Sequence, residues 1–126
     1  MQKTIVQVIE DDEILSNTIK DELEGEGFEV IQSFDGEEGL KIAKENKPDI
    51  ILLDIIMPKL DGIAVLKMLK LDANIKNIPV IILTVYGDMD KISDTIELGA
   101  KAYFIKDQQK LSEVVKTVKE ILNNKN

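Results

Sequence analysis

The chain has 126 residues, a length typical of one domain, and its 44% hydrophobic and 32% charged residues suit a globular protein with a packed core. It contains no cysteine, which excludes disulfides, thiol chemistry and cysteine zinc sites, and no histidine, which removes the commonest metal ligand and general base. All 16 basic residues are lysines, and the net charge of −8 argues against direct binding of nucleic acid.

The first predicted strand runs from Thr4 to Ile9 and leads into the acidic sequence EDDE. Because the N-terminal segment turns acidic before a sufficient apolar region develops, it does not resemble a signal peptide. No later stretch reaches the length of a membrane span. We therefore expect a cytoplasmic protein. Asp12 is placed to cap the first helix, which Gly25 and Gly27 end.

The second strand is predicted at Phe28–Ser33, and Asp35 with Glu38 three residues later predicts a capping box at the start of the second helix. The third strand is predicted at Asp49–Asp54, and Asp61–Gly62 marks the loop before the third helix. The apolar content of this third strand is typical of a strand buried on both faces.

The fourth strand is predicted at Pro79–Thr84, with Gly87–Asp88 in the loop that follows and Gly99 at the end of the fourth helix. The fifth strand is predicted at Ala102–Lys106. The last helix carries an apolar stripe of 3.6-residue period. Its members are Leu111, Val114, Val115, Val118, Ile121 and Leu122. Five strands alternating with five helices predict an α/β domain with a parallel sheet covered on both faces.

Asp54 is unusual because it ends the apolar run Ile50–Leu53 and is followed at once by two isoleucines. A carboxylate at this position is costly to remove from water unless another group compensates it. Aspartates often cap helices or close strands, but a strand that is otherwise wholly apolar leaves that structural interpretation poorly supported. Asp54 is therefore the first candidate for a functional residue.

Other polar residues follow the predicted strands at the same edge of the sheet, where ligands of open α/β folds bind. They are Glu10, Asp11, Thr84 and Lys106. Carboxylates this close repel one another unless a cation or a shared proton intervenes, and magnesium prefers such an oxygen-only site. Asp54 beside a metal, with Thr84 and Lys106 to hold phosphoryl oxygens, could act as a nucleophile and form an aspartyl phosphate.

Four motifs in this order resemble the response-regulator receiver domains of two-component signalling. They are the pair Glu10-Asp11, the sequence LLDIIMPKLDG around Asp54, ILT ending at Thr84, and GAKAYFIK ending at Lys106. The resemblance covers the whole chain, residues 1–126, as one receiver domain without an output domain. It implies a flavodoxin-like doubly wound (βα)5 fold with strand order 2-1-3-4-5.

The resemblance implies that Asp54 is the phosphoacceptor and that Glu10 and Asp11 are the acidic pair at a magnesium site, with Asp11 as the direct ligand of the two. The backbone carbonyl of Ile56, two residues beyond Asp54, would complete the protein's share of the coordination. The cofactor implied is Mg²⁺.

The resemblance also assigns roles to three residues on the last two strands. Thr84 is the switch hydroxyl, Lys106 pairs with the phosphoryl group, and Tyr103 is the aromatic switch residue that turns inward when Thr84 moves. The protein would be a switch and no turnover enzyme, assisting only its own phosphorylation and dephosphorylation. Singly, each residue also has a structural interpretation as strand packing or a surface lysine.

The sequence departs from the family at three positions. Asp107 follows Lys106 where the family has proline after a cis bond, and a cis Lys-Asp bond would cost about 3 kcal/mol more than trans. We expect Asp107 to cap the fifth helix instead, with Gln109 and Lys110 in its first turn. Val85 stands where alanine or glycine is usual.

Ile56 stands where the family often has a polar residue. Together with Tyr86 it predicts an apolar wall that keeps water from an acyl phosphate. We therefore expect slow phosphorylation by small donors and a long-lived phosphorylated state.

The implied partners are a sensor histidine kinase or phosphotransfer protein and a downstream protein target, reached through the face of the fourth helix, fifth strand and fifth helix. Neither nucleic acid nor membrane is an expected partner, and the chain would be a monomer or a phosphorylation-linked dimer. Two alternatives remain. One is an interaction module that no longer needs phosphate, and the other is a magnesium phosphohydrolase with an aspartyl nucleophile. The second usually carries Asp-x-Asp, which Asp54-Ile55-Ile56 lacks.

Overall fold

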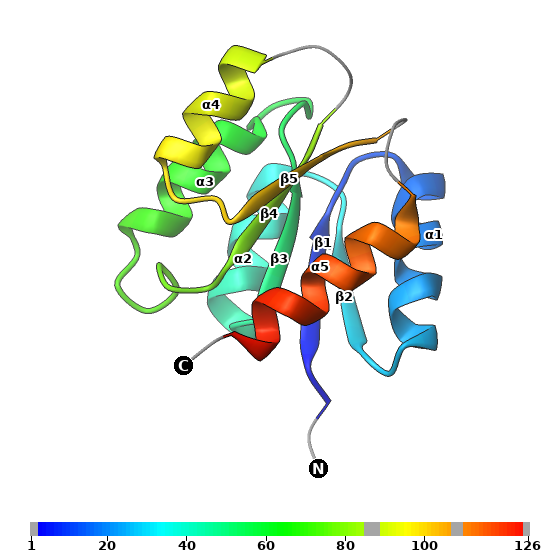
Figure 1. Ribbon diagram of the computed structural model, residues 1–126. Coiled ribbons are helices and arrows are strands. Elements are labelled where there is room, and N and C mark those ends of the chain that lie inside the picture. Colours follow the sequence, from blue (N-terminus) through cyan, green and yellow to red (C-terminus); the bar gives the residue numbers. More distant parts are fainter. Residues whose placement is uncertain (1–2, 85–88, 107–109, 125–126) are drawn as a thin grey trace.

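The computed structural model describes residues 3–84, 89–106 and 110–124, in which five strands alternate with five helices (Figure 1). The elements are β1 (Ile5–Ile9), α1 (Glu13–Gly25), β2 (Glu29–Ser33), α2 (Gly36–Asn46), β3 (Ile50–Asp54), α3 (Gly62–Leu71), β4 (Val80–Thr84), α4 (Met89–Glu97), β5 (Ala102–Ile105) and α5 (Leu111–Asn123). Each predicted strand is present within one residue of its expected bounds. None of the described helices is long and apolar enough to cross a bilayer.

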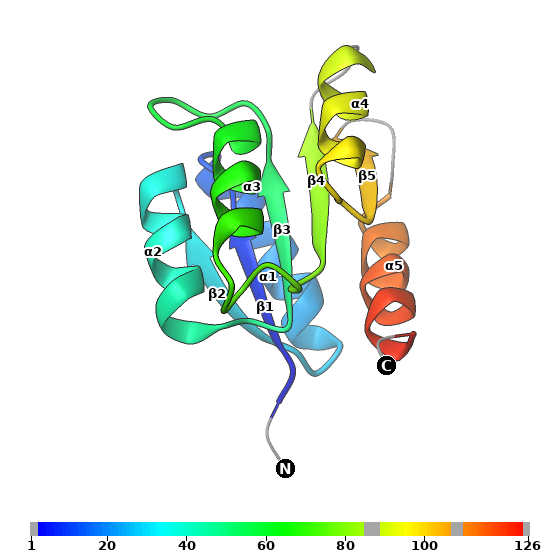
Figure 2. The ribbon, with the colours of Figure 1, turned by 90° about the vertical axis from the view of Figure 1, so that its left-hand side faces the viewer.

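The five strands form one parallel sheet in the order β2-β1-β3-β4-β5, as the flavodoxin-like fold requires. Helices α1 and α5 cover one face, and α2, α3 and α4 lie on the other (Figures 1 and 2). Because β1 and β3 are neighbours at the centre of the sheet, the residues that follow both strands lie at the same edge.

The apolar sequence of the central strand β3 follows from its burial on both faces of the sheet. All five of its residues are buried, and its side chains alternate between the two faces of the sheet. Ile51 and Leu53 pack in the core beneath α2 and α3, whereas Ile50 and Leu52 pack in the core beneath α1 and α5. Asp54 is the single charged residue of a strand that has no solvent-facing side.

Three aspartates begin helices as N-caps. The carboxylates of Asp12, Asp35 and Asp61 each accept a hydrogen bond from a backbone N–H three residues later. The predicted capping box is modified, because the Glu38 carboxylate accepts from the backbone N–H of Phe34 and not from that of Asp35.

The prediction for the start of the fifth helix was wrong. Helix α5 begins at Leu111 with Lys110 as its N-cap residue and without a side-chain capping bond, so Lys110 does not lie in the first turn. A side-chain capping bond needs a side-chain oxygen as acceptor, and the lysine side chain has none. Asp107, Gln109, Val85 and Tyr86, like the Gly87–Asp88 loop, lie outside the described residues.

Candidate functional site

Backbone hydrogen bonds bring the ends of four strands together at one edge of the sheet. Glu10 N–H donates to the Ser33 carbonyl at 3.0 Å, which keeps Glu10 in line with β1 beyond its last paired residue. Lys106 N–H donates to the Thr84 carbonyl at 2.8 Å, which does the same for Lys106 beyond β5. These two hydrogen bonds therefore fix the backbone at Glu10 and at Lys106, whose polar side chains lie at the edge.

Three carboxylates gather at this edge. Glu10 is fully buried and Asp54 is 1% exposed, whereas Asp11 is exposed. Each offers an oxygen, and these oxygens all lie within 4.8 Å of one another. A set of two or three carboxylates on rigid backbone, open to solvent on the Asp11 side, has the oxygen donors that Mg²⁺ prefers. The predicted acidic cluster is thus brought together by the fold.

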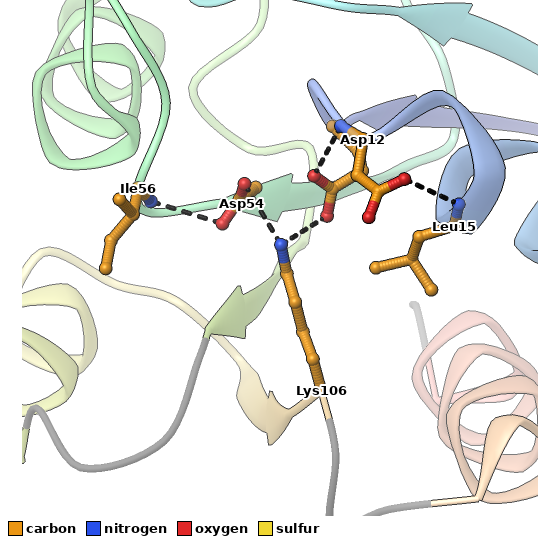
Figure 3. A network of polar contacts seen from close by, with 6 residues as sticks. Asp12, Leu15, Asp54, Ile56 and Lys106 are labelled. Carbon is orange, nitrogen blue, oxygen red and sulfur yellow. Dashed lines mark hydrogen bonds and ion pairs between the residues drawn. The ribbon is translucent and has the colours of Figure 1, made fainter.

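Lys106 lies between the two buried acids (Figure 3). Its Nζ is 2.6 Å from Oε1 of Glu10 and 3.1 Å from Oδ2 of Asp54. Neither oxygen has a directed hydrogen bond among the described residues, so the ion pair with Lys106 is what compensates their charge. The second oxygen of Glu10 accepts from the backbone N–H of Asp12 at 3.1 Å.

The environment of Asp54 disfavours its charged form. The pKa of its carboxyl is raised from 3.8 to about 8, because burial and, to a lesser extent, the nearby Glu10 charge raise it by more than the Lys106 ammonium lowers it. The balance shows that one lysine does not fully compensate two buried acids. A second cation or a proton at Asp54 would complete the compensation.

The environment of Lys106, in contrast, favours its charged form. Burial alone lowers the pKa of its ammonium, but close contact with Glu10 and Asp54 outweighs burial and holds the pKa above the ordinary 10.5. The lysine therefore stays charged, with 16% of its side chain exposed at the mouth of the site. A protonated lysine here can contact an anionic group bound to Asp54.

The loop after β3 is tied to Asp54. The Ile56 backbone N–H donates to Oδ1 of Asp54 at 3.1 Å, so one carboxylate oxygen is held by the loop while the other faces Lys106. The Ile56 side chain is 44% exposed beside the acid (Figure 3). The role predicted for the Ile56 carbonyl as a metal ligand stays a prediction.

Gly62 is a residue whose importance the sequence reasoning missed. Its N–H donates to the Ile55 carbonyl at 2.7 Å, which closes the loop onto itself. A Cβ at this position would lie 2.2 Å from the Asp54 carbonyl oxygen and 2.5 Å from the Ile55 Cα. Only glycine lets the first turn of α3 pack this closely against the backbone of Asp54. Its position after the Asp61 cap was noticed, but the close approach depends on tertiary packing.

A network of buried hydrogen bonds also supports the backbone at Glu10. Gln7, buried in β1, donates from Nε2 to Oγ of Ser33 at 3.0 Å and to the Gly39 carbonyl at 2.9 Å. Because the Ser33 carbonyl in turn accepts from Glu10, this amide fixes the strand end that carries an acid of the site. The signal in the sequence was a glutamine at the centre of the apolar strand IVQVI.

The two predicted switch residues lie on adjacent strands. Thr84 is fully buried at the end of β4, in the sheet edge next to Lys106. Tyr103 is on β5 opposite Ile82 and is 41% exposed. The fold therefore places both residues on β4 and β5, the two strands farthest from β2, although the movement predicted for them stays a prediction.

Comparison with known proteins gives a consistent assignment. A family model described as the response regulator receiver domain matches residues 6–119. The polar-differentiation response regulator DivK of Brucella anthropi is 38% identical over 104 residues, which cover 80% of this chain and 82% of DivK. A probable transcriptional regulator, ycf27 of Porphyridium aerugineum, is 37% identical over 106 residues; the match spans 84% of this chain and 43% of the relative.

A solved response regulator from Chloroflexus aurantiacus superposes with a TM-score of 0.91 at 29% identity, covering 98% of this chain and all of that one. The sequence match, the parallel sheet in the order 2-1-3-4-5 and the acidic edge agree. The chain belongs to the response regulator receiver domains of two-component signalling.

Proposed function

We propose that this receiver domain is a signalling switch that accepts a phosphoryl group on Asp54. The observation that carries the proposal is the placement of this carboxylate: it is 1% exposed, beside Glu10 and Asp11, with the Lys106 ammonium 3.1 Å away. A structural aspartate needs neither acidic neighbours nor a shared lysine. A phosphoacceptor needs a cation on one side and an ammonium on the other.

Magnesium is the cofactor that fits the donor set. Glu10, Asp11 and Asp54 would hold it, together with the Ile56 carbonyl, and the ion would supply the positive charge that offsets the incoming phosphoryl oxygens. Two residues of the chain orient the reacting groups. The Ile56 N–H orients Oδ1 of Asp54, and Lys106 offers its ammonium to a phosphoryl oxygen.

In the transfer, a carboxylate oxygen of Asp54 attacks phosphorus, a P–O bond forms, and the P–N bond of a phosphohistidine on the partner breaks. The attacking group must be the carboxylate. Burial and the nearby Glu10 charge raise the pKa of Asp54 to about 8, so a cation at the site, which favours the charged form, also favours the attacking carboxylate. This makes the reaction dependent on the divalent cation.

The phosphoryl group then biases two conformers of the domain. Thr84, buried at the site edge, would move to a phosphoryl oxygen, and Tyr103 would turn inward from its exposed position on β5. The face of α4, β5 and α5 would change and be read by a downstream protein. The phosphodonor is a sensor histidine kinase or a phosphotransfer protein.

The test uses phosphoramidate with magnesium and intact mass spectrometry. The wild type should gain one phosphoryl group, and Asp54→Asn should gain none. Asp49→Asn is the matched control, because Asp49 lies at the opposite end of the same strand and should leave phosphorylation unchanged. Equal labelling of the wild type and Asp54→Asn would overturn the assignment. No labelling of the wild type would favour a phosphate-independent interaction module.

A further inference from the structure

A second unusual lysine lies far from the phosphoacceptor, at the end of α3 remote from Gly62. Lys70 is half-buried, and its Nζ donates a hydrogen bond to the backbone carbonyl of Lys76 at 3.1 Å, in the connection between α3 and β4. Its Cε and Nζ lie 3.5 and 3.8 Å from the point that a Cβ on Gly99 would occupy, just beyond α4. Three segments therefore hold this amine in place.

Lys70 differs from the other fixed lysines in its partner. Lys106 contacts two carboxylates and Lys119 contacts Glu26. Within residues 3–84, 89–106 and 110–124, no acid lies within ion-pair distance of Lys70, and its hydrogen-bond acceptor is a neutral carbonyl. A carboxylate would stabilise the ammonium form strongly, whereas a carbonyl carries no net charge, stabilises the ammonium less, and also accepts from a neutral amine.

The surroundings favour the neutral amine. Burial lowers the pKa of Lys70, and the positive charge of Lys101 lowers it further. Because the bond to Lys76 uses an N–H, it leaves the lone pair of the neutral amine free. Half-buried lysines with a free lone pair are the nucleophilic ones and are targets of acylation.

We propose that Lys70 is a modification site whose Nζ is acylated by small acyl phosphates without an enzyme. In this step the lone pair of the amine attacks the carbonyl carbon of the reagent and an N–C bond forms. The C–O bond to the phosphate breaks, inorganic phosphate leaves with the electron pair, and the proton of the amine passes to solvent. No oxidant or further reactant is needed.

The same surroundings suit the reagent and the product. An acyl phosphate is an anion, and the exposed Lys76 and Lys101 near the amine attract it. The amide that forms keeps one N–H for the Lys76 carbonyl, so acylation removes the charge without breaking this hydrogen bond. The positive charge beside Lys101, at the junction of α3 and α4, is lost.

The proposal is tested with acetyl phosphate in the presence of a chelator, so that magnesium-dependent phosphorylation of Asp54 does not interfere. The protein is digested with a protease that cleaves at acidic residues, and acetylation is quantified by mass spectrometry. Lys67 is the internal reference, because it lies one turn earlier on α3 and is exposed. Lys70 should react faster than Lys67 by about threefold or more, since each unit of pKa changes the neutral fraction tenfold.

Two controls test whether the acetylation rate of Lys70 depends on its surroundings in the folded protein. In urea the ratio of the Lys70 and Lys67 rates should fall to about one, because burial and the nearby Lys101 charge are lost. Lys101→Gln should slow Lys70 while Lys67 is unchanged, and Lys101→Arg, which keeps the charge, should leave both rates unchanged. A Lys70 rate at or below that of Lys67 in the folded wild type would overturn the proposal, as would an unaltered Lys70 rate in Lys101→Gln.

Discussion

Strand β3 has an aspartate at each end, and the two have different environments. Asp49 precedes the strand, and its Oδ2 accepts a hydrogen bond from the Ile5 N–H at 2.8 Å while its own N–H donates to the Ile5 carbonyl at 2.9 Å. Asp54 ends the strand, with Glu10 as an acidic neighbour and Lys106 as a shared cation. The first acid joins β3 to the start of β1, and the second is part of a cluster of charges.

Asp49 therefore stabilises the fold, whereas the charged form of Asp54 lowers its stability. Asp49 is half-buried, has one neutral donor and lies where two strands need to be joined. Burial and the nearby Glu10 charge raise the pKa of Asp54 to about 8 and make its charged form unfavourable, although Lys106 opposes them. A group whose charged form costs stability at a rigid edge is a candidate for a functional site, because a bound cation would favour that form.

The largest expected effect comes from Gly62→Ala, which would disturb the Asp54 end of β3 and leave the Asp49 end intact. The new Cβ would lie 2.2 Å from the Asp54 carbonyl oxygen, and backbone cannot move aside as a flexible side chain can. We expect a loss of about 3 kcal/mol in the free energy of unfolding, measured by urea titration. Any folded fraction should also bind magnesium more weakly, because the loop that carries Ile56 is displaced.

Gly25→Ala is the matched control for this variant. A Cβ on Gly25 meets no atom within 4 Å, and the residue is the last of α1. This substitution should leave stability within about 1 kcal/mol of the wild type or raise it, because alanine loses less backbone entropy in a helix. Equal destabilisation by the two substitutions would contradict the close approach at Gly62.

The sequence was sufficient to predict the elements, their order and the site acids. Strand ends in a parallel sheet meet at one edge, so apolar runs closed by Glu10, Asp54 and Lys106 predicted which residues gather there. The two contacts of Lys106, at 2.6 and 3.1 Å, were beyond prediction, because they depend on side-chain geometry across three strands. The close approach of Gly62 was also beyond prediction, since it depends on how α3 packs against the end of β3.

The second prediction concerns the pH dependence of folding stability that results from Asp54. The Asp54 pKa is about 8 in the folded protein, against 3.8 as the ordinary value, so between these pH values the folded state holds a proton that the unfolded state has released. The folded state is therefore favoured at low pH, and this contribution is lost as pH rises from 3.8 to about 8. In metal-free protein the melting temperature should fall across this window.

Asp54→Asn removes the titrating group and should therefore remove most of that fall. Thermal melts in chelator at a series of pH values measure the difference. Magnesium added near pH 8 should raise the wild-type melting temperature more than that of Asp54→Asn, because it binds the folded carboxylates. Parallel curves for the wild type and Asp54→Asn would show that Asp54 titrates as an ordinary acid.

The smallest effect is expected at Ile56, which is two residues beyond Asp54 and is 44% exposed. Its backbone N–H bonds to Oδ1 of Asp54, so a substitution that changes only the side chain keeps this contact. In Ile56→Asn a polar amide replaces an apolar side chain and can hold a water near the acyl phosphate. Hydrolysis of phospho-Asp54 should then be about threefold faster, a change of less than 1 kcal/mol in the barrier.

Ile56→Val is the matched control, because it keeps an apolar side chain of similar shape and should keep the wild-type lifetime. The lifetime is measured by labelling each protein with phosphoramidate and magnesium, removing the donor, and following the phosphorylated mass with time. If asparagine and valine give the same lifetime as isoleucine, the side chain at 56 does not control water at the site. The long lifetime expected from an apolar neighbour of Asp54 would then need another cause. If only asparagine shortens the lifetime, the apolar side chain at position 56 limits the approach of water to phospho-Asp54.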